Sequence, residues 1–441
     1  MFKQKISVVG LGFVGLTLAV VNAKKGFQTI GIDINQKKIH ELKKGIPDFY
    51  EPNLQKILSK VIKEKSIIFS ENFEKVPKTD ITFVTVGTPA NNKGEIELKF
   101  LKNALEQILK TLQNKKSPHL IVIKSTVIPT TTIKKIIPQL KNNKNIQVVV
   151  NPEFLREGNA INDLMNPHLI VIGEENKKAG QKLINYYKLF YKKIPEIIRT
   201  DYSSAELIKY SNNAFLATKI SFINSIANIC QNIPNVNVRT IAYAIGKDPR
   251  IGPLFLEAGP GFGGSCLPKD LSALIKFSDN LQKNNSLLKE VKNVNQKQPL
   301  KIIDLMDKIK VIKKNNIISI FGLAFKKNTD DIRYSVSVDV VRELLKMNLK
   351  IKVHDPMAIE NFKKIFKNKI TYSSTINDCL NQSNCCIILT DWDDYKKISS
   401  DNLIKYMKTP AMIDTRGIFK KSNFGNIKFE SLGLGNEKNN Y

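Results

Sequence analysis

Residues 5–33 combine an apolar strand, a glycine-rich turn, an apolar helix and a second strand in an order that few folds accommodate. Residues 5–9 (KISVV) lead into Gly10-Leu-Gly12-Phe-Val-Gly15 and an apolar helix through Ala23. Glycines at this spacing permit a tight turn and close approach of a pyrophosphate, and the helix N-terminus attracts phosphate. We therefore expect a dinucleotide to bind here. The alternative is a glycine-rich turn without a ligand.

The residues that follow indicate which dinucleotide binds. Residues 27–32 form a second expected strand, which ends in Asp33, 23 residues after Gly10. A carboxylate at this position binds the ribose hydroxyls and would repel a 2′-phosphate, which favours NAD over NADP. Lys38 follows closely enough to contact the adenosine side.

Alternating strands and helices extend this unit into a larger sheet. At 441 residues the chain exceeds what one hydrophobic core usually supports, so we expect two or three domains. The alternation favours a parallel, doubly wound α/β sheet, in which ligands bind outside the carboxyl ends of the strands. Polar residues at three strand ends are either aimed at the cofactor or ordinary caps and turns: Thr88, Thr126, Glu153 and Glu157. The expected strands are residues 66–70, 81–86, 120–124, 146–150 and 169–172.

Residues 201–230 are expected to form one long helix that is apolar on more than one face. A helix that is apolar nearly all round is buried, which suits a spine that links two domains and packs against a second subunit. Lys209 and Asn213 lie at i and i+4 and would project from the same side. Lys209 is either functional or a lysine whose ammonium reaches solvent.

Strands and helices resume after a polar connection near residues 281–300. The expected strands are residues 316–322, 350–354, 385–389 and 411–413, with a helix over residues 337–347. The fold class is therefore α/β, with two doubly wound Rossmann-like domains joined by a long central helix. Gly322 lacks the other fingerprint glycines, so no second dinucleotide is expected. Three cations near strand ends, Lys326, Arg333 and Arg416, suit a phosphate or uracil-type ligand or lie on the surface. The tail from about Asn423 is expected to fray.

Residues 261–270, GFGGSCLPKD, place Cys266 after a glycine pair and before a helix expected over residues 267–277. Gly263 and Gly264 would allow close approach to a ligand or a positive φ, and a helix N-terminus favours thiolate. Cys266 is therefore a candidate nucleophile, with Lys269 and Asp270 on the same helix face. The alternative is a buried structural thiol.

Composition excludes several other classes of protein. The formal charge of +29 comes from lysines spread along the whole chain, often beside asparagine, which indicates solvated surface and no nucleic-acid site. No long apolar run or signal peptide is visible, so we expect a cytoplasmic protein that does not bind membranes. Five cysteines without CxxC spacing support neither a disulfide framework nor a metal site.

An NAD site, a cysteine at a helix start and a lysine on a buried helix suit one chemistry. The thiol adds to an aldehyde, a hydride leaves to NAD, and the thioester is hydrolysed. The chain resembles the UDP-glucose/GDP-mannose dehydrogenase family over about residues 5–420, in nine motifs that occur in order: VVGLGFVGL, FYEPNL, VGTP, KSTVIP, NPEFLREG, IKYSNNAFLA, DPRIGP, GPGFGGSCLPKD and FGLAFKKNTDDIR.

The resemblance implies a four-electron oxidation of a nucleotide-sugar C6 alcohol to a carboxylate with two NAD molecules used in turn, and within the family it favours UDP-glucose. It implies an NAD-binding domain at residues 1–200, a central dimerisation domain at 201–300, a UDP-sugar-binding domain at 301–425 and a tail at 426–441. It also implies a homodimer, because Arg250 resembles an arginine that reaches the neighbouring subunit's site.

The resemblance also assigns roles to residues of this chain. The implied catalytic residues are Cys266 as nucleophile, Lys209, Asn213 and Asp270 for the alcohol oxidation and the oxyanions, and Glu153 with Thr126 for the hydrolytic water. The implied NAD contacts are Gly10, Gly12, Val14, Gly15, Asp33, Lys38, Thr88, Thr126, Glu157, Lys269 and Arg333. The implied substrate contacts are Glu153, Phe154, Leu155, Arg156, Glu157, Lys209, Asn213, Arg250, Phe255, Leu256, Glu257, Ala258, Gly259, Gly263, Lys326 and Arg416.

Substrate identity stays open between UDP-glucose, UDP-galactose, a UDP-N-acetylhexosamine and GDP-mannose. The Ser265-Cys266 pair with Lys269-Asp270 argues against the N-acetylhexosamine members, and the DPRIGP run argues against GDP-mannose. Four residues depart from the usual UDP-glucose pattern: Phe262, Tyr334, Val336 and Thr415. A non-catalytic nucleotide sensor is the remote alternative, but it would have no need for Cys266, Lys209, Asn213 and Asp270 together.

Overall fold

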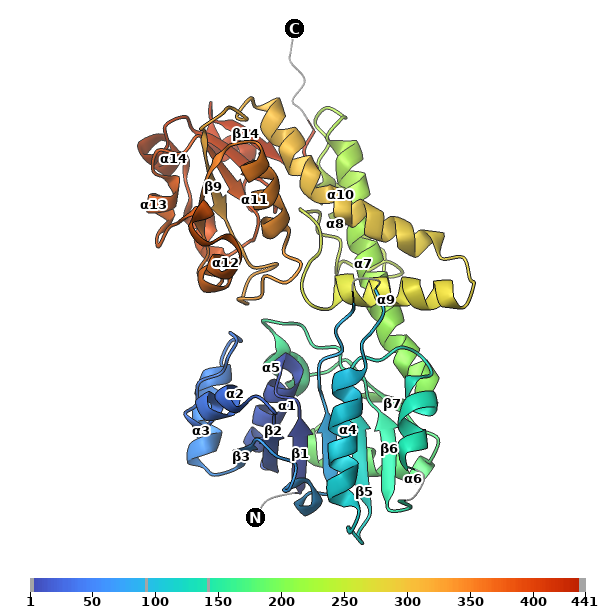
Figure 1. The fold of residues 1–441 in the computed structure, drawn as a ribbon. Helices are drawn as coiled ribbons and strands as arrows, with labels where there is room; N and C mark the ends of the chain where they lie inside the picture. The colour runs from blue at the N-terminus through green and yellow to red at the C-terminus, as the bar shows by residue number, and fades with distance from the viewer. Residues whose placement is uncertain (1–3, 92–93, 141–142, 436–441) are drawn as a thin grey trace. The chain divides into compact units, whose positions relative to one another are not determined.

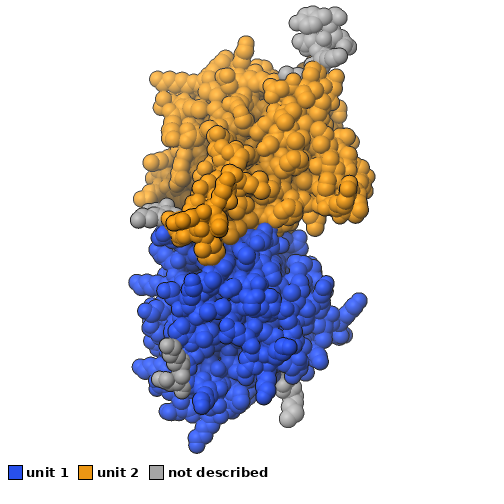
Figure 2. Space-filling view, turned by 90° about the vertical axis from the view of Figure 1, so that its right-hand side faces the viewer, with its two compact units in different colours: residues 1–212 blue, residues 213–441 orange. Residues whose placement is uncertain are grey.

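The protein is described by a computed structural model that covers residues 4–91, 94–140 and 143–435. The chain forms two compact units, residues 1–212 and 213–441, which Figure 2 shows in different colours. The boundary falls within the long helix α7 (Tyr202–Cys230). No helix among the described residues is long and apolar enough to cross a membrane.

Unit 1 is built on an eight-stranded sheet with the order β3-β2-β1-β4-β5-β6-β7-β8 (Figure 1). The fold class expected from the sequence is confirmed, and the expected parallel sheet has one exception, because β7 pairs antiparallel with β6. The connection between these two strands, residues 151–168, contains only the short helix α5 (Ala160–Met165). The strands are β1 Lys5–Val9, β2 Gln28–Ile32, β3 Ile67–Ser70, β4 Ile81–Val84, β5 His119–Ile123, β6 Ile146–Val150, β7 Leu169–Gly173 and β8 Glu196–Thr200.

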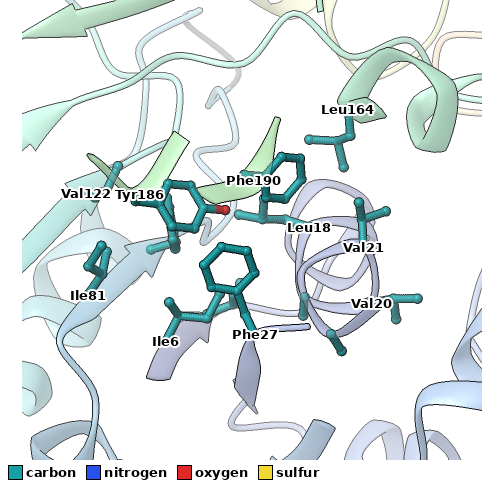
Figure 3. Packing of buried hydrophobic residues seen from close by; sticks show 14 of the residues in the cluster. Ile6, Leu18, Val20, Val21, Phe27, Ile81, Val122, Leu164, Tyr186 and Phe190 are labelled. Atoms are coloured by element: carbon teal, nitrogen blue, oxygen red, sulfur yellow. The ribbon is translucent and has the colours of Figure 1, made fainter. Parts of the chain in front are cut away.

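Helices cover both faces of this sheet because its strands are apolar on both sides. Helices α1, α3 and α6 pack on one face, and α4 and the start of α7 pack on the other. Figure 3 shows the first of these cores, where the rings of Phe27 and Tyr186 lie 5.1 Å apart. The buried Tyr186 hydroxyl donates to Asn22 Oδ1 (2.6 Å), which satisfies a polar group that would otherwise be costly to bury. The helices are α1 Phe13–Lys24, α2 Gln36–Lys43, α3 Leu54–Lys63, α4 Lys99–Leu112, α5 and α6 Lys177–Phe190.

Unit 2 contains a six-stranded parallel sheet with the order β11-β10-β9-β12-β13-β14. This order repeats the β3-β2-β1-β4-β5-β6 part of unit 1, so both units have a Rossmann-like topology. The strands are β9 Ile317–Phe321, β10 Lys350–His354, β11 Thr371–Tyr372, β12 Cys385–Ile388, β13 Ala411–Asp414 and β14 Lys428–Ser431. The helices are α8 Val238–Gly246, α9 Leu267–Asn280, α10 Ser286–Lys308, α11 Val336–Lys346, α12 Ile359–Phe366, α13 Ile376–Leu380 and α14 Ser400–Tyr406.

The acid at the end of β10 is used differently from Asp33 in unit 1. Asp355 occupies the corresponding position, but its carboxylate is saturated by the protein itself, since a carboxylate offers about four lone-pair sites. Its oxygens accept from the backbone N–H groups of Leu323, Ala324, Met357 and Ala358 and from Trp392 Nε1, at 2.7–3.2 Å. No lone pair of Asp355 is left for a ribose hydroxyl.

Two further expectations from the sequence are corrected in unit 2. The connection at residues 281–300 is largely helix, because α10 buries Val291, Ile302 and Leu305 at helical spacing. The segment after Asn423 does not fray up to residue 435, because β14 pairs with β13; residues 436–441 lie outside the described part. In the single chain, three apolar side chains of helix α7 are more than half exposed, and its expected packing against a second subunit stays a prediction.

Candidate active site

The glycine turn of unit 1 has room for a ligand at one of its three glycines. At Gly10 an added Cβ would lie 2.8 Å from the Val86 backbone, and at Gly15 it would overlap the carbonyl oxygen of Gly10. Gly12, the N-cap of α1, has no heavy atom within 4 Å of such a Cβ. Packing thus explains Gly10 and Gly15, while Gly12 leaves the first turn of α1 open to a phosphate.

Asp33 and Lys38, the two charged residues expected near the dinucleotide, both form hydrogen bonds to the backbone of this turn. Asp33 accepts from the backbone N–H groups of Leu11 (2.8 Å) and Asn35 (3.0 Å). Lys38 Nζ donates to the Leu11 carbonyl (3.2 Å) and pairs with Asp48 (3.0 Å). The open helix N-terminus and an acid fixed at the end of β2 fit the diphosphate and ribose of a dinucleotide.

The carboxyl ends of β4, β5 and β6 bring several polar residues together. Thr88 Oγ1 donates to the carbonyl of Thr126 (2.7 Å), which ties two predicted NAD contacts to each other. Lys124, which the sequence analysis missed, is buried and donates to Asn151 Oδ1 (2.8 Å). Burial lowers the pKa of Lys124 to about 8, although Glu153 opposes this shift and Lys209 adds to it. The sequence signal that could have revealed Lys124 is its place at the end of the expected apolar strand, residues 120–124.

Lys209 and Glu153 form a buried ion pair in unit 1. Lys209 Nζ lies 3.1 Å from Glu153 Oε1, and the two side chains are only 4% and 7% exposed. The ammonium also lies 5.4 Å from the centre of the Phe154 ring, within cation–π range. Glu153 Oε2 accepts from the Leu155 N–H (2.6 Å), so the carboxylate is fixed at both oxygens. Lys209 is therefore not a lysine whose ammonium reaches solvent.

The rest of residues 153–160 is held by its own contacts. Arg156 binds Asp163 through two guanidinium nitrogens, at 3.0 and 2.6 Å, and its backbone N–H donates to the same carboxylate. Glu157 is buried, with 8% of its surface exposed. The structure thus gives Arg156 an intramolecular partner, while its predicted substrate contact stays a prediction.

In unit 2, Cys266 is the N-cap residue of α9 and is partly exposed. Its carbonyl accepts from the Asp270 N–H (2.8 Å), the first helical hydrogen bond of α9. The Asp270 carboxylate is buried and accepts from Asn213 Nδ2 (2.6 Å) and from Lys269 Nζ. The structure therefore joins Asn213, Lys269 and Asp270 in one hydrogen-bonded set at the first turn of the cysteine's helix.

Side-chain amides that the sequence analysis missed hold the segment before the cysteine. Asn224 Oδ1 accepts from the Gly259 N–H (2.9 Å), and Gln298 Nε2 donates to the Gly259 carbonyl (3.0 Å). Asn295 bonds both the N–H and the carbonyl of Phe262 (2.7 and 2.9 Å). Because these amides lie on α7 and α10, far from the segment in sequence, no local pattern could have revealed them.

The glycine pair contacts a second loop of unit 2. Gly264 has the expected positive φ (+81°), and its N–H donates to the Arg333 carbonyl (2.9 Å). A Cβ at Gly263 would lie 2.2 Å from the Tyr334 carbonyl oxygen, and one at Gly264 would lie 2.7 Å from the Phe325 ring. These glycines are thus required by contact with the loop after β9.

The cations expected to bind substrate or NAD lie in different environments. The Arg416 guanidinium already donates hydrogen bonds to the carbonyls of Leu389 (2.7 Å) and Phe325 (3.3 Å). Burial lowers the pKa of Arg416. Arg333 forms a bidentate pair with Asp331, and Lys326 Nζ lies 5.6 Å from the centre of the Phe325 ring. Arg250 pairs with Asp248 on an exposed turn, with 87% of its side chain accessible.

These features together define a dinucleotide-dependent oxidoreductase. They are a Rossmann sheet with an open glycine turn, a cysteine at a helix start and a buried lysine–carboxylate pair. Among the described residues no three histidine, cysteine or acidic side chains are grouped to hold a metal ion. Family models of the UDP-glucose/GDP-mannose dehydrogenase family match three stretches: the NAD binding domain at residues 4–191, the central domain at 203–297 and the UDP binding domain at 319–421. The chain belongs to this family, and NAD is its cofactor.

Named relatives agree with this placement. The chain is 37% identical to UDP-glucose 6-dehydrogenase TuaD of Bacillus subtilis, over 94% of this chain and 90% of the relative. It is also 37% identical to the UDP-glucose 6-dehydrogenase of Rickettsia bellii, over 98% and 100% of the two chains. A UDP-glucose dehydrogenase structure from Pyrobaculum islandicum superposes with a TM-score of 0.90 at 34% identity and 98% coverage of both chains. The UDP-N-acetyl-mannosamine dehydrogenase Cap5O of Staphylococcus aureus superposes less well, with a TM-score of 0.81 at 27% identity and 98% coverage of both.

Proposed function

We propose that this protein oxidises the C6 alcohol of UDP-glucose to the carboxylate of UDP-glucuronate with two molecules of NAD. The observation that carries the proposal is the position of Cys266 as the N-cap of α9, in a chain with an NAD binding domain and a UDP binding domain. Relatives named for UDP-glucose support this sugar over the N-acetylhexosamines.

The proposed oxidation proceeds through an aldehyde and a thioester bound to Cys266. In the first oxidation, C6 gives up a hydride and its hydroxyl a proton, leaving an aldehyde. The Cys266 thiolate then adds to the aldehyde, and loss of a second hydride gives a thioester. Water attacks the thioester, which releases the carboxylate and restores the thiol. Bound NAD serves as the two-electron acceptor in both oxidations.

Charged and amide groups stabilise the oxyanions that form on this route. The Lys209 ammonium and the Asn213 amide are hydrogen-bond donors suited to the alkoxide and tetrahedral stages, with Asp270 holding Asn213 in place. Glu153, fixed by Lys209 and the Leu155 N–H, acts with Thr126 on the hydrolytic water. The domain ranges, the further NAD and substrate contacts and the cytoplasmic location expected from the sequence belong to the same proposal.

The test is to count NADH molecules formed per UDP-glucose consumed by the purified protein with excess NAD. We expect two, because the alcohol must lose four electrons to become a carboxylate. UDP-galactose, a UDP-N-acetylhexosamine and GDP-mannose serve as parallel substrates. Turnover of one of these alone would keep the chemistry and change the sugar, whereas absence of turnover on all four would favour a nucleotide sensor.

We also propose that the protein is a homodimer that associates through α7. Three aromatic or branched apolar side chains lie seven residues apart on this helix, and each is more than half exposed in the single chain: Phe215 (66%), Phe222 (52%) and Ile229 (56%). Such a stripe at heptad spacing is typical of a helix that packs against another helix. The exposed Arg250 is available to reach a partner subunit.

Analytical ultracentrifugation is expected to show a dimer for the wild type and a monomer for Phe222→Glu, because a charge at the centre of the stripe cannot be buried unpaired. Ile404→Glu on α14 is the matched control, since Ile404 is 62% exposed but lies off the stripe. A wild-type monomer, or a dimer that survives Phe222→Glu, would rule out this interface.

A further inference from the structure

Glu51 is a buried carboxylate to which neither the sequence analysis nor the proposed chemistry gives a role. It lies between α2 and α3 in unit 1, with 4% of its surface exposed. Its oxygens accept from two backbone N–H groups far along the chain, those of Gly158 (2.7 Å) and Ala160 (2.8 Å). Charge-assisted bonds of this kind are among the stronger ones in proteins.

The segment that Glu51 holds carries the proposed substrate residues. Residues 153–160 contain Glu153, Phe154 and Glu157 and end at the first residue of α5. The N-cap residue of α5, Asn159, makes no side-chain cap of its own, so the Glu51 carboxylate supplies the acceptor for this helix start. Gly158 has a φ of +75°, a conformation that the hydrogen bond from its own N–H to Glu51 helps to fix.

The residues just before Glu51 contact the glycine turn. The Phe49 ring lies 5.3 Å from the ring of Phe13, in the first turn of α1. Asp48 pairs with Lys38, whose ammonium donates to the Leu11 carbonyl. Residues 48–51 therefore touch the dinucleotide turn at one end and the segment 153–160 at the other.

We propose that Glu51 is a positioning residue that fixes segment 153–160 for binding of the nucleotide sugar and ties it to the dinucleotide turn through residues 48–51. This inference rests on the proposed function, since it assigns the segment to the sugar nucleotide. In this proposal Glu51 acts through the backbone of Gly158 and Ala160 and not on the reacting atoms or the cofactor.

Glu51→Gln is the sharpest change, because it keeps the shape but removes the charge and turns an amide N–H toward one of the two backbone donors. The expected result is a loss of UDP-glucose affinity of about ten- to a hundredfold in calorimetry, with a clearly smaller loss of NADH affinity, because Glu157 is the one proposed NAD contact in the segment. The KM for UDP-glucose should rise by a similar factor, while kcat changes less. Glu51→Asp, which keeps the charge on a shorter side chain, should recover part of the affinity.

The matched control is Glu64→Gln, at the exposed C-terminal end of α3, where binding and turnover should equal those of the wild type. Equal losses of NADH and UDP-glucose affinity together with a lower melting temperature would show a merely structural role and overturn the inference. If Glu51→Gln does not fold, Glu51→Asp must still weaken UDP-glucose selectively, and no effect there also overturns it. A wild type that does not bind UDP-glucose would instead refute the proposed function.

Discussion

Replacing Cys266 by serine is expected to lower steady-state NADH formation from UDP-glucose by at least about a thousandfold, because the alcohol oxygen is a far poorer nucleophile than a thiolate. Binding of UDP-glucose, measured by calorimetry, should stay within a few-fold of the wild type, since the thiol acts after the substrate is bound. A serine variant that retains turnover within tenfold of the wild type would contradict the assignment of Cys266 as nucleophile.

Alkylation provides a second check on the same residue. Of the five cysteines, Cys266 is partly exposed and the other four are buried. Burial also raises the pKa of Cys379 to about 12, which keeps that thiol protonated and unreactive. Iodoacetamide should therefore modify one thiol of the native protein, identified by mass spectrometry, at the rate at which activity is lost. UDP-glucose should slow both processes together.

Replacing Lys209 by methionine is expected to have the second largest effect, because it removes a proposed oxyanion donor and leaves Glu153 as an unpaired buried carboxylate. We expect kcat to fall by about a hundred- to a thousandfold. The free energy of unfolding should fall by about 3–5 kcal/mol, the usual consequence of removing one partner of a buried pair. Denaturant unfolding and initial rates measure the two effects separately.

The double variant Lys209→Met/Glu153→Gln separates stability from catalysis. Without the unpaired charge, the protein should regain most of the lost stability, because a neutral amide is far less costly to bury. Activity should stay at the level of the single variant or below it. If the double variant recovers turnover, Lys209 serves only to neutralise Glu153, and its assignment as an oxyanion donor is wrong.

Most of the fold followed from periodicity and glycine spacing. The pattern from Lys5 to Asp33 predicts β1, α1 and β2, because each part of it is needed locally to bind one dinucleotide. The reversed direction of β7 could not be predicted, because no local pattern in residues 151–168 specifies the direction in which the next strand runs. Helix α10 was missed because its lysines and asparagines resemble a linker, although its buried residues recur at helical spacing.

The residue types of the candidate site were predictable, but their partners were not. Motifs indicated Lys209, Glu153 and Cys266 one by one, because each type has a known chemical use. Two of these contacts join positions that are distant in sequence: the ion pair of Lys209 with Glu153, and the hydrogen bond from the Gly158 N–H to Glu51. Such contacts are set by the path of the chain through the sheet, which a local pattern does not encode.

The late position of strand β14 in the sequence determines when unit 2 can complete its fold during synthesis. The Val238 N–H donates to the Gly433 carbonyl, and the Gly435 N–H donates to the Val236 carbonyl, so opposite ends of unit 2's sequence meet. Unit 1 has all eight strands of its sheet by Thr200 and can fold while later residues are still being synthesised. Unit 2 cannot close until residues 428–435 have left the ribosome. The sheet of unit 2 is therefore completed after the sheet of unit 1 during synthesis, so the two units fold one after the other.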